Sequence, residues 1–63
     1  EEILSIKKMT KLQKRLIHLG YDVGKLDGIL GAKTRQAVRS IQMRLGLPAD
    51  SWPNNQLLRL LNL

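Results

Sequence analysis

Two segments of this chain place apolar residues three and four positions apart, and each segment ends in the dipeptide Leu-Gly. This spacing gathers the apolar side chains on one stripe of an α-helix, and a glycine directly after such a stripe commonly ends the helix. No run of residues alternates between apolar and polar for long enough to predict a strand. At 63 residues, the chain can therefore form one small all-α domain with a single core.

We predict three helices with a long first connection. The helices cover roughly residues 6–19, 32–45 and 54–62, and the connections cover roughly residues 20–31 and 47–53. The residues expected to face the core are Ile6, Met9, Leu12, Leu16 and Leu19 in the first helix, Thr34, Ala37, Val38, Ile41 and Leu45 in the second, and Leu57, Leu58, Leu60 and Leu61 in the third. The third helix has an apolar side too broad for a lone surface helix, so it must pack against the other two.

The expected helix ends carry typical capping residues. Ser5 and Asn54 can each accept a hydrogen bond from an unpaired amide in the first turn that follows. Gly20 and Gly46 can adopt the left-handed conformation that ends a helix, and Gly31 can cap the start of the second helix.

The first two helices each carry an apolar residue followed by glutamine, at Leu12-Gln13 and Ile41-Gln42. We interpret this as similar helix geometry and not as an internal repeat. Both glutamines lie at the edge of an apolar stripe, where a partly buried amide needs hydrogen-bond partners. We therefore expect each glutamine to hold the backbone of a loop.

The first connection contains the glycine-rich stretch YDVGKLDGILGAKT. It lacks the G-x-x-x-x-G-K-[ST] order of a phosphate-binding loop and the alternating oxygen ligands of a calcium loop. Asp27-Gly28 is typical of a turn, because aspartate bonds nearby amides and glycine supplies a positive φ. We expect an ordered connector in which Tyr21 and either Leu26 or Ile29 fill the gap between the helices.

Catalytic and metal chemistry are hard to build from these residues. There is no cysteine, and the one histidine, His18, falls on the basic face of the first helix. Asp22 and Asp27 lie in one connection rather than across a cleft, and no serine has an evident histidine and acid partner. We predict a chain that is not an enzyme, that needs no metal or cofactor, and that has no membrane span.

Lysine and arginine number 11 against 5 aspartates and glutamates, which gives a formal net charge of +6. Such a balance favours anionic partners, namely nucleic acid, anionic lipid or a polymer that carries carboxylates. A basic three-helix chain would also suit a nucleic-acid-binding helix-turn-helix domain, but that motif needs a much shorter turn than the first connection offers. A protein-interaction module that docks through Ile17 or Met43 is a further alternative.

Several short motifs follow one another along residues 9–61. They are Leu12-Gln13, Leu16, Gly20-Tyr21, Asp27-Gly28, Gly31, Thr34, Ala37-Val38, Gln42 and Gly46-Leu47-Pro48. In this order they resemble the type 1 peptidoglycan-binding domain family. Ile41 stands where that family usually has an aromatic residue, and Ser51 stands where it usually has glycine. The turn before the third helix is therefore expected either to differ from the family's turn or to be strained.

The resemblance implies a non-catalytic module that targets an attached cell-wall hydrolase or lytic transglycosylase to murein. The subtype is similar to the domain at the C-terminal end of some lytic murein transglycosylases. Its implied partners are the glycan strands and stem peptides of peptidoglycan and the attached catalytic domain, and nucleic acid is not expected. The implied location is the bacterial cell envelope, periplasmic or extracellular. Because the chain begins at Glu1, we expect residues 1–63 to be a single domain taken from a larger protein.

Eight residues are candidates for ligand binding, namely Tyr21, Asp27, Gly28, Thr34, Arg35, Arg39, Gln42 and Trp52. Arg35 and Arg39 lie one helical turn apart and could pair with stem-peptide carboxylates. Tyr21 and Trp52 are the two aromatic residues, and each either covers the core or offers a platform for a sugar. Thr34 falls on the core side of the second helix, where we expect it to bond the Asp27-Gly28 turn.

Overall fold

The computed structural model describes residues 5–63, in which three helices follow one another along the chain. They are α1 (Ile6–His18), α2 (Ala32–Arg44) and α3 (Asn55–Leu60), and no strand occurs in this part of the chain. The predicted all-α class and the three predicted helices are confirmed, each helix ending one or two residues before its predicted end. Residues 1–4, which the predicted domain includes, lie outside the described residues.

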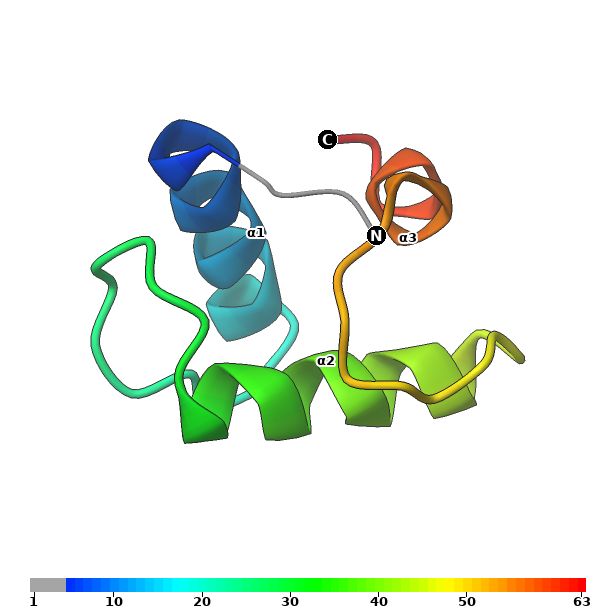
Figure 1. Cartoon of the computed structure of the whole chain (residues 1–63). Helices are drawn as coiled ribbons and strands as arrows, with labels where there is room; N and C mark the ends of the chain where they lie inside the picture. Colours follow the sequence, from blue (N-terminus) through cyan, green and yellow to red (C-terminus); the bar gives the residue numbers. More distant parts are fainter. Residues whose placement is uncertain (1–4) are drawn as a thin grey trace.

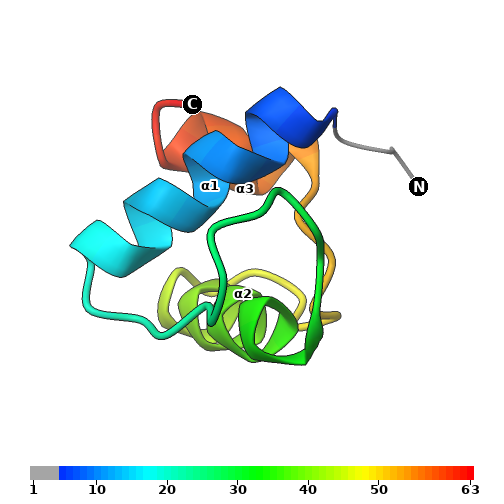
Figure 2. The same ribbon diagram turned by 90° about the vertical axis from the view of Figure 1, so that its left-hand side faces the viewer.

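The two outer helices sit on one side of α2. Figure 1 shows α1 standing over one end of α2, with α3 seen end-on over the other end. The view turned by 90° in Figure 2 places α1 and α3 together above α2. The first connection forms a wide loop beside α1 and returns to the start of α2, whereas the second runs back along α2 before it rises to α3 (Figure 1). Each connection therefore lies beside α2.

The core lies where the three helices meet. Its buried apolar residues are Met9, Leu12 and Leu16 in α1, Val23 in the first connection, Ala37, Val38 and Ile41 in α2, and Leu57, Leu58 and Leu61 in or just after α3. Tyr21, Leu30 and Leu47 are partly buried and pack against this core. The radius of gyration is 10.1 Å, close to the roughly 11 Å expected for a compact chain of this length.

The ends of the predicted apolar stripes are not buried. Ile6, Leu19, Leu45 and Leu60 are 71%, 44%, 41% and 54% exposed, so the prediction that these four residues face the core is wrong. Short helices that cross bury only the part of each stripe that lies under the crossing, and residues at the ends extend beyond it. The remaining residues of the predicted stripes are buried, as expected.

All three helices end in the same way. Gly20, Gly46 and Asn62 follow the ends of α1, α2 and α3 with φ angles of 96°, 75° and 60°. In each case the next residue donates its amide to the carbonyl five positions back, from Tyr21 to Leu16, from Leu47 to Gln42 and from Leu63 to Leu58. The positive φ and this hydrogen bond together supply a donor to carbonyls of the last turn that would otherwise lack one.

The predicted N-caps are also confirmed. The side chains of Ser5 and Asn54 accept hydrogen bonds from the amides of Lys8 at 3.2 Å and Leu57 at 2.9 Å. Gly31 caps α2 through its backbone alone. These caps fix where each helix begins and hence where each connection ends.

Candidate functional site

A fully buried glutamine of α1 holds the first connection. Gln13 Oε1 accepts the amide of Gly28 at 2.9 Å, and Gln13 Nε2 donates to the Ile29 carbonyl at 3.1 Å and to Thr34 Oγ1 at 3.2 Å. The Thr34 hydroxyl in turn donates to the Val23 carbonyl at 3.2 Å. Gly28 and Ile29 are thus bonded to Gln13 itself, and Val23 is bonded to Thr34, so two parts of the loop join one network around a buried amide that must be paired.

The predicted contact between Thr34 and the Asp27-Gly28 turn is wrong, because Gln13 lies between them and makes the bond to Gly28. The turn itself forms as predicted. Gly28 has a φ of 75°, and Asp27 Oδ1 accepts the amide of Ile29 at 2.9 Å. The carboxylate therefore closes the turn from outside while the glutamine holds it from inside.

The gap beneath this loop is filled by residues other than those predicted. Leu26 and Ile29 are 44% and 63% exposed, so neither fills it, whereas Tyr21 is half-buried against the core as expected. Val23 is buried and Leu30 is partly buried in their place. The reason is the turn, which directs the residues on either side of it outward once Gly28 lies against α1.

A second buried glutamine, on α2, holds the second connection. Gln42 Oε1 accepts the amide of Ser51 at 3.0 Å, and Gln42 Nε2 donates to the Trp52 carbonyl at 2.9 Å and to Asp50 Oδ1 at 3.0 Å. Asp50 Oδ1 also accepts the amide of Trp52 at 2.9 Å. The expectation that both glutamines hold loop backbone is confirmed.

The two loops use the same arrangement of groups. In each, a glutamine oxygen accepts the amide of a residue with positive φ, Gly28 or Ser51, and the glutamine nitrogen donates to the next carbonyl along the chain. In each, the aspartate before that residue accepts the amide two positions on. The similarity between α1 and α2 therefore extends beyond helix geometry into the connections, and our narrower interpretation of it is wrong. We refer to these two arrangements as the glutamine clamps.

Ser51 carries backbone strain in the second clamp, as predicted, because a residue with a Cβ atom adopts its φ of 64° only at a cost of about 1 kcal/mol. We expect Ser51→Gly to raise the free energy of unfolding by roughly 0.5–1 kcal/mol, since glycine removes the clash but loses more entropy on folding. Urea unfolding followed by circular dichroism measures this. Ser51→Ala keeps the Cβ atom and serves as the control. A glycine variant no more stable than the alanine variant would contradict the prediction.

Two carboxylates of these loops are held in their charged form. The amide of Trp52, and then the Gln42 side chain, lower the pKa of Asp50 below its ordinary value of 3.8. The amide of Gly24, which lies 2.8 Å from Asp22 Oδ1, and then the Lys33 ammonium at 3.4 Å, lower the pKa of Asp22 in the same way. Both carboxylates therefore act as hydrogen-bond acceptors for backbone amides of their own loop.

A lowered pKa in the folded state makes stability depend on pH. Below the ordinary value of 3.8 the unfolded chain binds more protons than the folded chain, so stability falls as pH drops toward the folded pKa. We expect the unfolding temperature to fall as the pH drops from about 5 through 3.8 toward the folded pKa, and to fall less in Asp50→Asn, which cannot titrate there. Calorimetry across this range measures it. Equal pH dependence in the variant and the wild type would contradict the assignment to Asp50.

The first loop also borders a shallow hollow of about 260 Å³. Its lining includes Lys25, Asp27 and Lys33 along with the apolar residues Val23 and Ile29. Lys33 forms an exposed ion pair with Asp22 across this loop, and such pairs contribute little to stability. The hollow therefore offers both charged and apolar residues to a ligand.

The eight candidate residues fall into three groups. Gly28, Thr34 and Gln42 are buried and act by holding the loops, so a ligand meets the surface that they shape rather than their side chains. Asp27, Tyr21 and Trp52 are exposed or half-buried in the connections. Arg35 and Arg39 are exposed on α2, and Arg39 donates to the carbonyl of Ala49 at 3.3 Å in the second connection. Arg35 and Arg39 lie on the stretch of α2 between Thr34, which bonds to Gln13 of the first clamp, and Gln42 of the second.

One surface feature had no counterpart in the sequence analysis. A cleft of about 180 Å³ lies between α1 and α3, lined by Lys8, Lys11, Asn55, Leu58, Arg59 and Leu63. From sequence, Lys8 and Lys11 belong to a solvated basic face, and nothing in the spacing of α1 tells which of its lysines will lie opposite α3. That pairing depends on how the helices cross.

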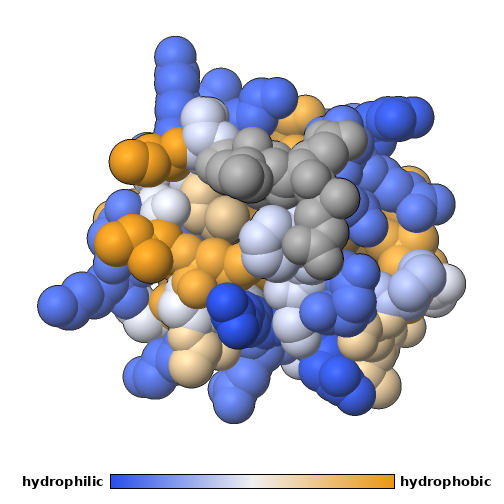
Figure 3. All heavy atoms as spheres, in the orientation of Figure 1, coloured by the Kyte–Doolittle hydropathy of each residue, from blue (hydrophilic) through white to orange (hydrophobic). Residues whose placement is uncertain are grey.

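Ile17 and Met43 are 48% and 63% exposed, which the interaction-module alternative requires. Figure 3 shows apolar atoms reaching the surface in separate areas with charged side chains projecting around them.

None of the helices in the described part of the chain has the length and apolar content needed to cross a bilayer. Over residues 5–63, no three His, Cys, Asp or Glu side chains could together hold a metal ion.

Residues 6–61 match the family model described as "Putative peptidoglycan binding domain". The chain belongs to this family. The matched range agrees with the resemblance that we identified over residues 9–61, and the predicted peptidoglycan-binding module is confirmed at the level of the family.

Known proteins resemble this chain over a small part of their own length. The spore cortex-lytic enzyme of Bacillus cereus is 45% identical over 40 residues, which are 64% of this chain and 15% of that protein. The crystal structure of SltB3 from Pseudomonas aeruginosa in complex with NAG-NAM-pentapeptide superposes with a TM-score of 0.90 and 43% identity, over 97% of this chain and 16% of that chain. A second SltB3 structure, in complex with NAG-anhNAM-pentapeptide, gives a TM-score of 0.91 and 41% identity, over 100% of this chain and 17% of that chain. This chain therefore spans 15% to 17% of the length of these relatives.

Proposed function

We propose that this chain is a non-catalytic module that binds peptidoglycan and holds an attached cell-wall hydrolase or lytic transglycosylase on murein. The observation that carries the proposal is the family match over residues 6–61. The names of the relatives support the kind of enzyme to which such a module is joined, because the Bacillus relative is a cortex-lytic enzyme. They also support a location in the bacterial cell envelope, periplasmic or extracellular.

The binding surface in this proposal is the exposed side of α2 together with the two connections. Arg35 and Arg39 supply guanidinium groups that can pair with the carboxylates of stem peptides. Tyr21 and Trp52 are half-buried, so each can cover the core and still present one edge to a sugar. The SltB3 chains are bound to ligands that contain both sugar and pentapeptide, which supports recognition of both parts.

The net charge of +6 adds a long-range attraction to anionic wall polymers. Salt largely screens this attraction beyond about 8 Å at physiological ionic strength. Specific contacts are screened less when they are partly buried or made by two hydrogen bonds. Binding measured at low and at moderate salt therefore distinguishes specific recognition from attraction by net charge alone.

The proposal that the chain itself is non-catalytic rests on where the acids of residues 5–63 lie. Asp22, Asp27 and Asp50 each accept backbone amides of their own loop. Glycoside hydrolysis needs two carboxylates that face each other across a cleft about 5–10 Å wide. Carboxylates used to close turns are poorly placed for that chemistry, so we assign the reaction to another part of the parent protein.

The experiment is retention of the chain on purified insoluble peptidoglycan at low and moderate salt, with DNA-cellulose in parallel. We expect retention on peptidoglycan that survives moderate salt and weak retention on DNA-cellulose. Arg35→Gln with Arg39→Gln should reduce retention several-fold. Lys7→Gln with Lys14→Gln removes the same charge from exposed positions of α1 and should have a smaller effect. Retention on any anionic matrix, lost equally in both double variants, would contradict the proposal.

A further inference from the structure

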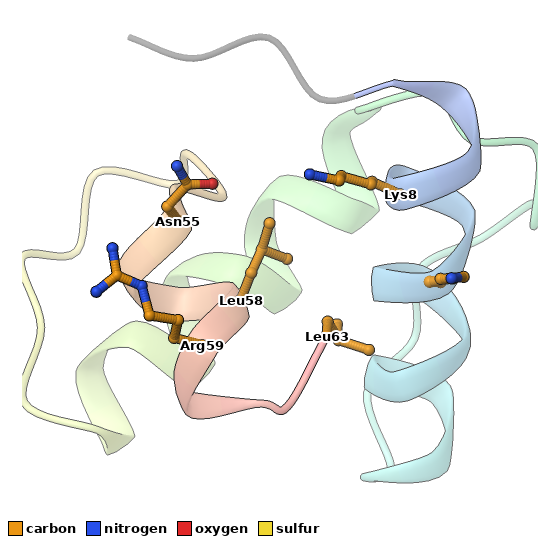
Figure 4. A pocket seen from close by; sticks show the side chains of 6 residues that line it. Lys8, Asn55, Leu58, Arg59 and Leu63 are labelled. Carbon is orange, nitrogen blue, oxygen red and sulfur yellow. The ribbon is translucent and has the colours of Figure 1, made fainter.

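The cleft between α1 and α3 has basic walls and an apolar floor. Figure 4 shows Lys8 reaching from α1 toward α3, with Leu58 standing between the two helices and Leu63 near α1. Lys8 and Lys11 come from α1, and Asn55 and Arg59 come from α3. Leu58 is 5% exposed, so it forms a floor rather than a rim.

The walls of this cleft are fixed relative to each other. Arg15 of α1 donates through Nη1 to the carbonyl of Leu61, just after α3. Leu58 and Leu61 are also part of the core, which joins both helices. The cleft therefore forms when the domain folds, and a ligand does not need to bring the two helices together.

The chemistry of the lining selects the ligand. Among the described residues, its lining includes three cations and no carboxylate side chain, so it favours an anionic ligand. The Asn55 side chain adds an amide, and Leu58 and Leu63 offer contact for a small apolar group. A carboxylate next to a methyl-sized side chain satisfies both requirements.

The size of the cleft further limits which ligands can bind. At about 180 Å³ it lies below the roughly 300–1,000 Å³ of sites that enclose a whole drug-sized ligand. It can accept one or two amino-acid residues but not a disaccharide. Basic walls on two helices also favour a ligand with more than one carboxylate.

We propose that this cleft binds the carboxylate-bearing end of a peptidoglycan stem peptide, as a site separate from the exposed side of α2. This inference rests on the proposed function for the identity of the peptide. Lys8 and Lys11 bind carboxylate from α1, and a methyl side chain of the peptide packs on Leu58. Asn55 adds an amide from α3, and Arg59, whose guanidinium lies on the side of α3 away from α1 in Figure 4, extends the positive surface beyond the cleft.

The test is a titration of the isotope-labelled chain with a synthetic stem tetrapeptide that ends in D-alanine, followed by amide chemical shifts. We expect shifts at Lys8, Lys11, Leu58 and Arg59. The same peptide with a C-terminal amide lacks the terminal carboxylate, so we expect it to bind about tenfold more weakly.

Two double variants separate the cleft from general charge. Lys8→Gln with Lys11→Gln should weaken binding of the tetrapeptide about tenfold. Lys7→Gln with Lys14→Gln lies on the same helix, removes the same charge and should stay within about twofold. All four lysines are exposed, so both variants should fold, which the dispersion of the amide spectrum verifies.

The outcomes also distinguish this inference from the proposed function. Shifts confined to α2, no shifts at all, or equal weakening in the two double variants would overturn the cleft as a site. If the wild-type chain is still retained on insoluble peptidoglycan, the proposed function survives that result. Binding of the tetrapeptide in the cleft without retention on peptidoglycan would support the site and overturn the proposed function.

Discussion

Replacing Gln13 by alanine is expected to remove at least about a third of the domain's stability against unfolding. The change removes three hydrogen bonds and leaves the Gly28 amide buried without its acceptor. At about 1 kcal/mol for each bond, with a further penalty for the unpaired amide, the loss is roughly 3–4 kcal/mol. A chain of this length has only about 3–9 kcal/mol of stability in total. Urea unfolding followed by circular dichroism measures the change.

The matched control for this prediction is Gln36→Ala. Gln36 is an exposed residue of α2 without a hydrogen bond to either connection, so the change should cost less than about 0.5 kcal/mol. Gln42→Ala should behave like Gln13→Ala, because Gln42 makes three equivalent bonds in the second clamp. If Gln13→Ala were as stable as Gln36→Ala, the loop would not depend on the clamp.

Gly28→Ala is expected to cost about 2–4 kcal/mol. A Cβ atom at this position would lie 2.6 Å from Ile6 Cγ2, 2.9 Å from Thr10 Oγ1 and 3.0 Å from the Ile6 carbonyl oxygen. The carbonyl cannot move aside without disturbing the first turn of α1, and the φ of 75° adds about 1–2 kcal/mol for a residue with a side chain. The free energy of unfolding, measured in urea or by calorimetry, tests this.

Gly20→Ala separates the steric clash of a Cβ atom from the conformational cost of a positive φ. Gly20 also has a positive φ, of 96°, but a Cβ atom there would have no atom within 4 Å. That variant should lose only the conformational part, about 1–2 kcal/mol. Equal losses at the two positions would mean that the close approach of Gly28 to α1 has no energetic effect.

Local sequence patterns were sufficient for the helices and their ends. Capping residues such as Ser5, Asn54 and Gly20 act within a few positions of themselves, so their roles follow from neighbours along the chain. The prediction that Gln13 and Gln42 hold loops also succeeded, because a buried amide must find partners wherever it lies.

The errors concern contacts that depend on how the helices cross. Ile6 and Leu60 fit their apolar stripes by spacing, yet they extend past the crossing and are exposed. Thr34 was matched with the nearest turn, but a side chain from α1 lies between them. The α1–α3 cleft could not be foreseen for the same reason, since it needs the relative positions of two helices separated by most of the chain.

The glutamine clamps separate the shape of the connections from the residues displayed on them. Every hydrogen bond from the glutamines to the connections, apart from the one to the Asp50 side chain, involves backbone. Lys25, Leu26 and Ile29 therefore project from a loop whose course does not depend on their identity. Such positions can be exchanged freely during evolution or in engineering. One rigid frame could thus be adapted to walls of different composition without a new fold being required.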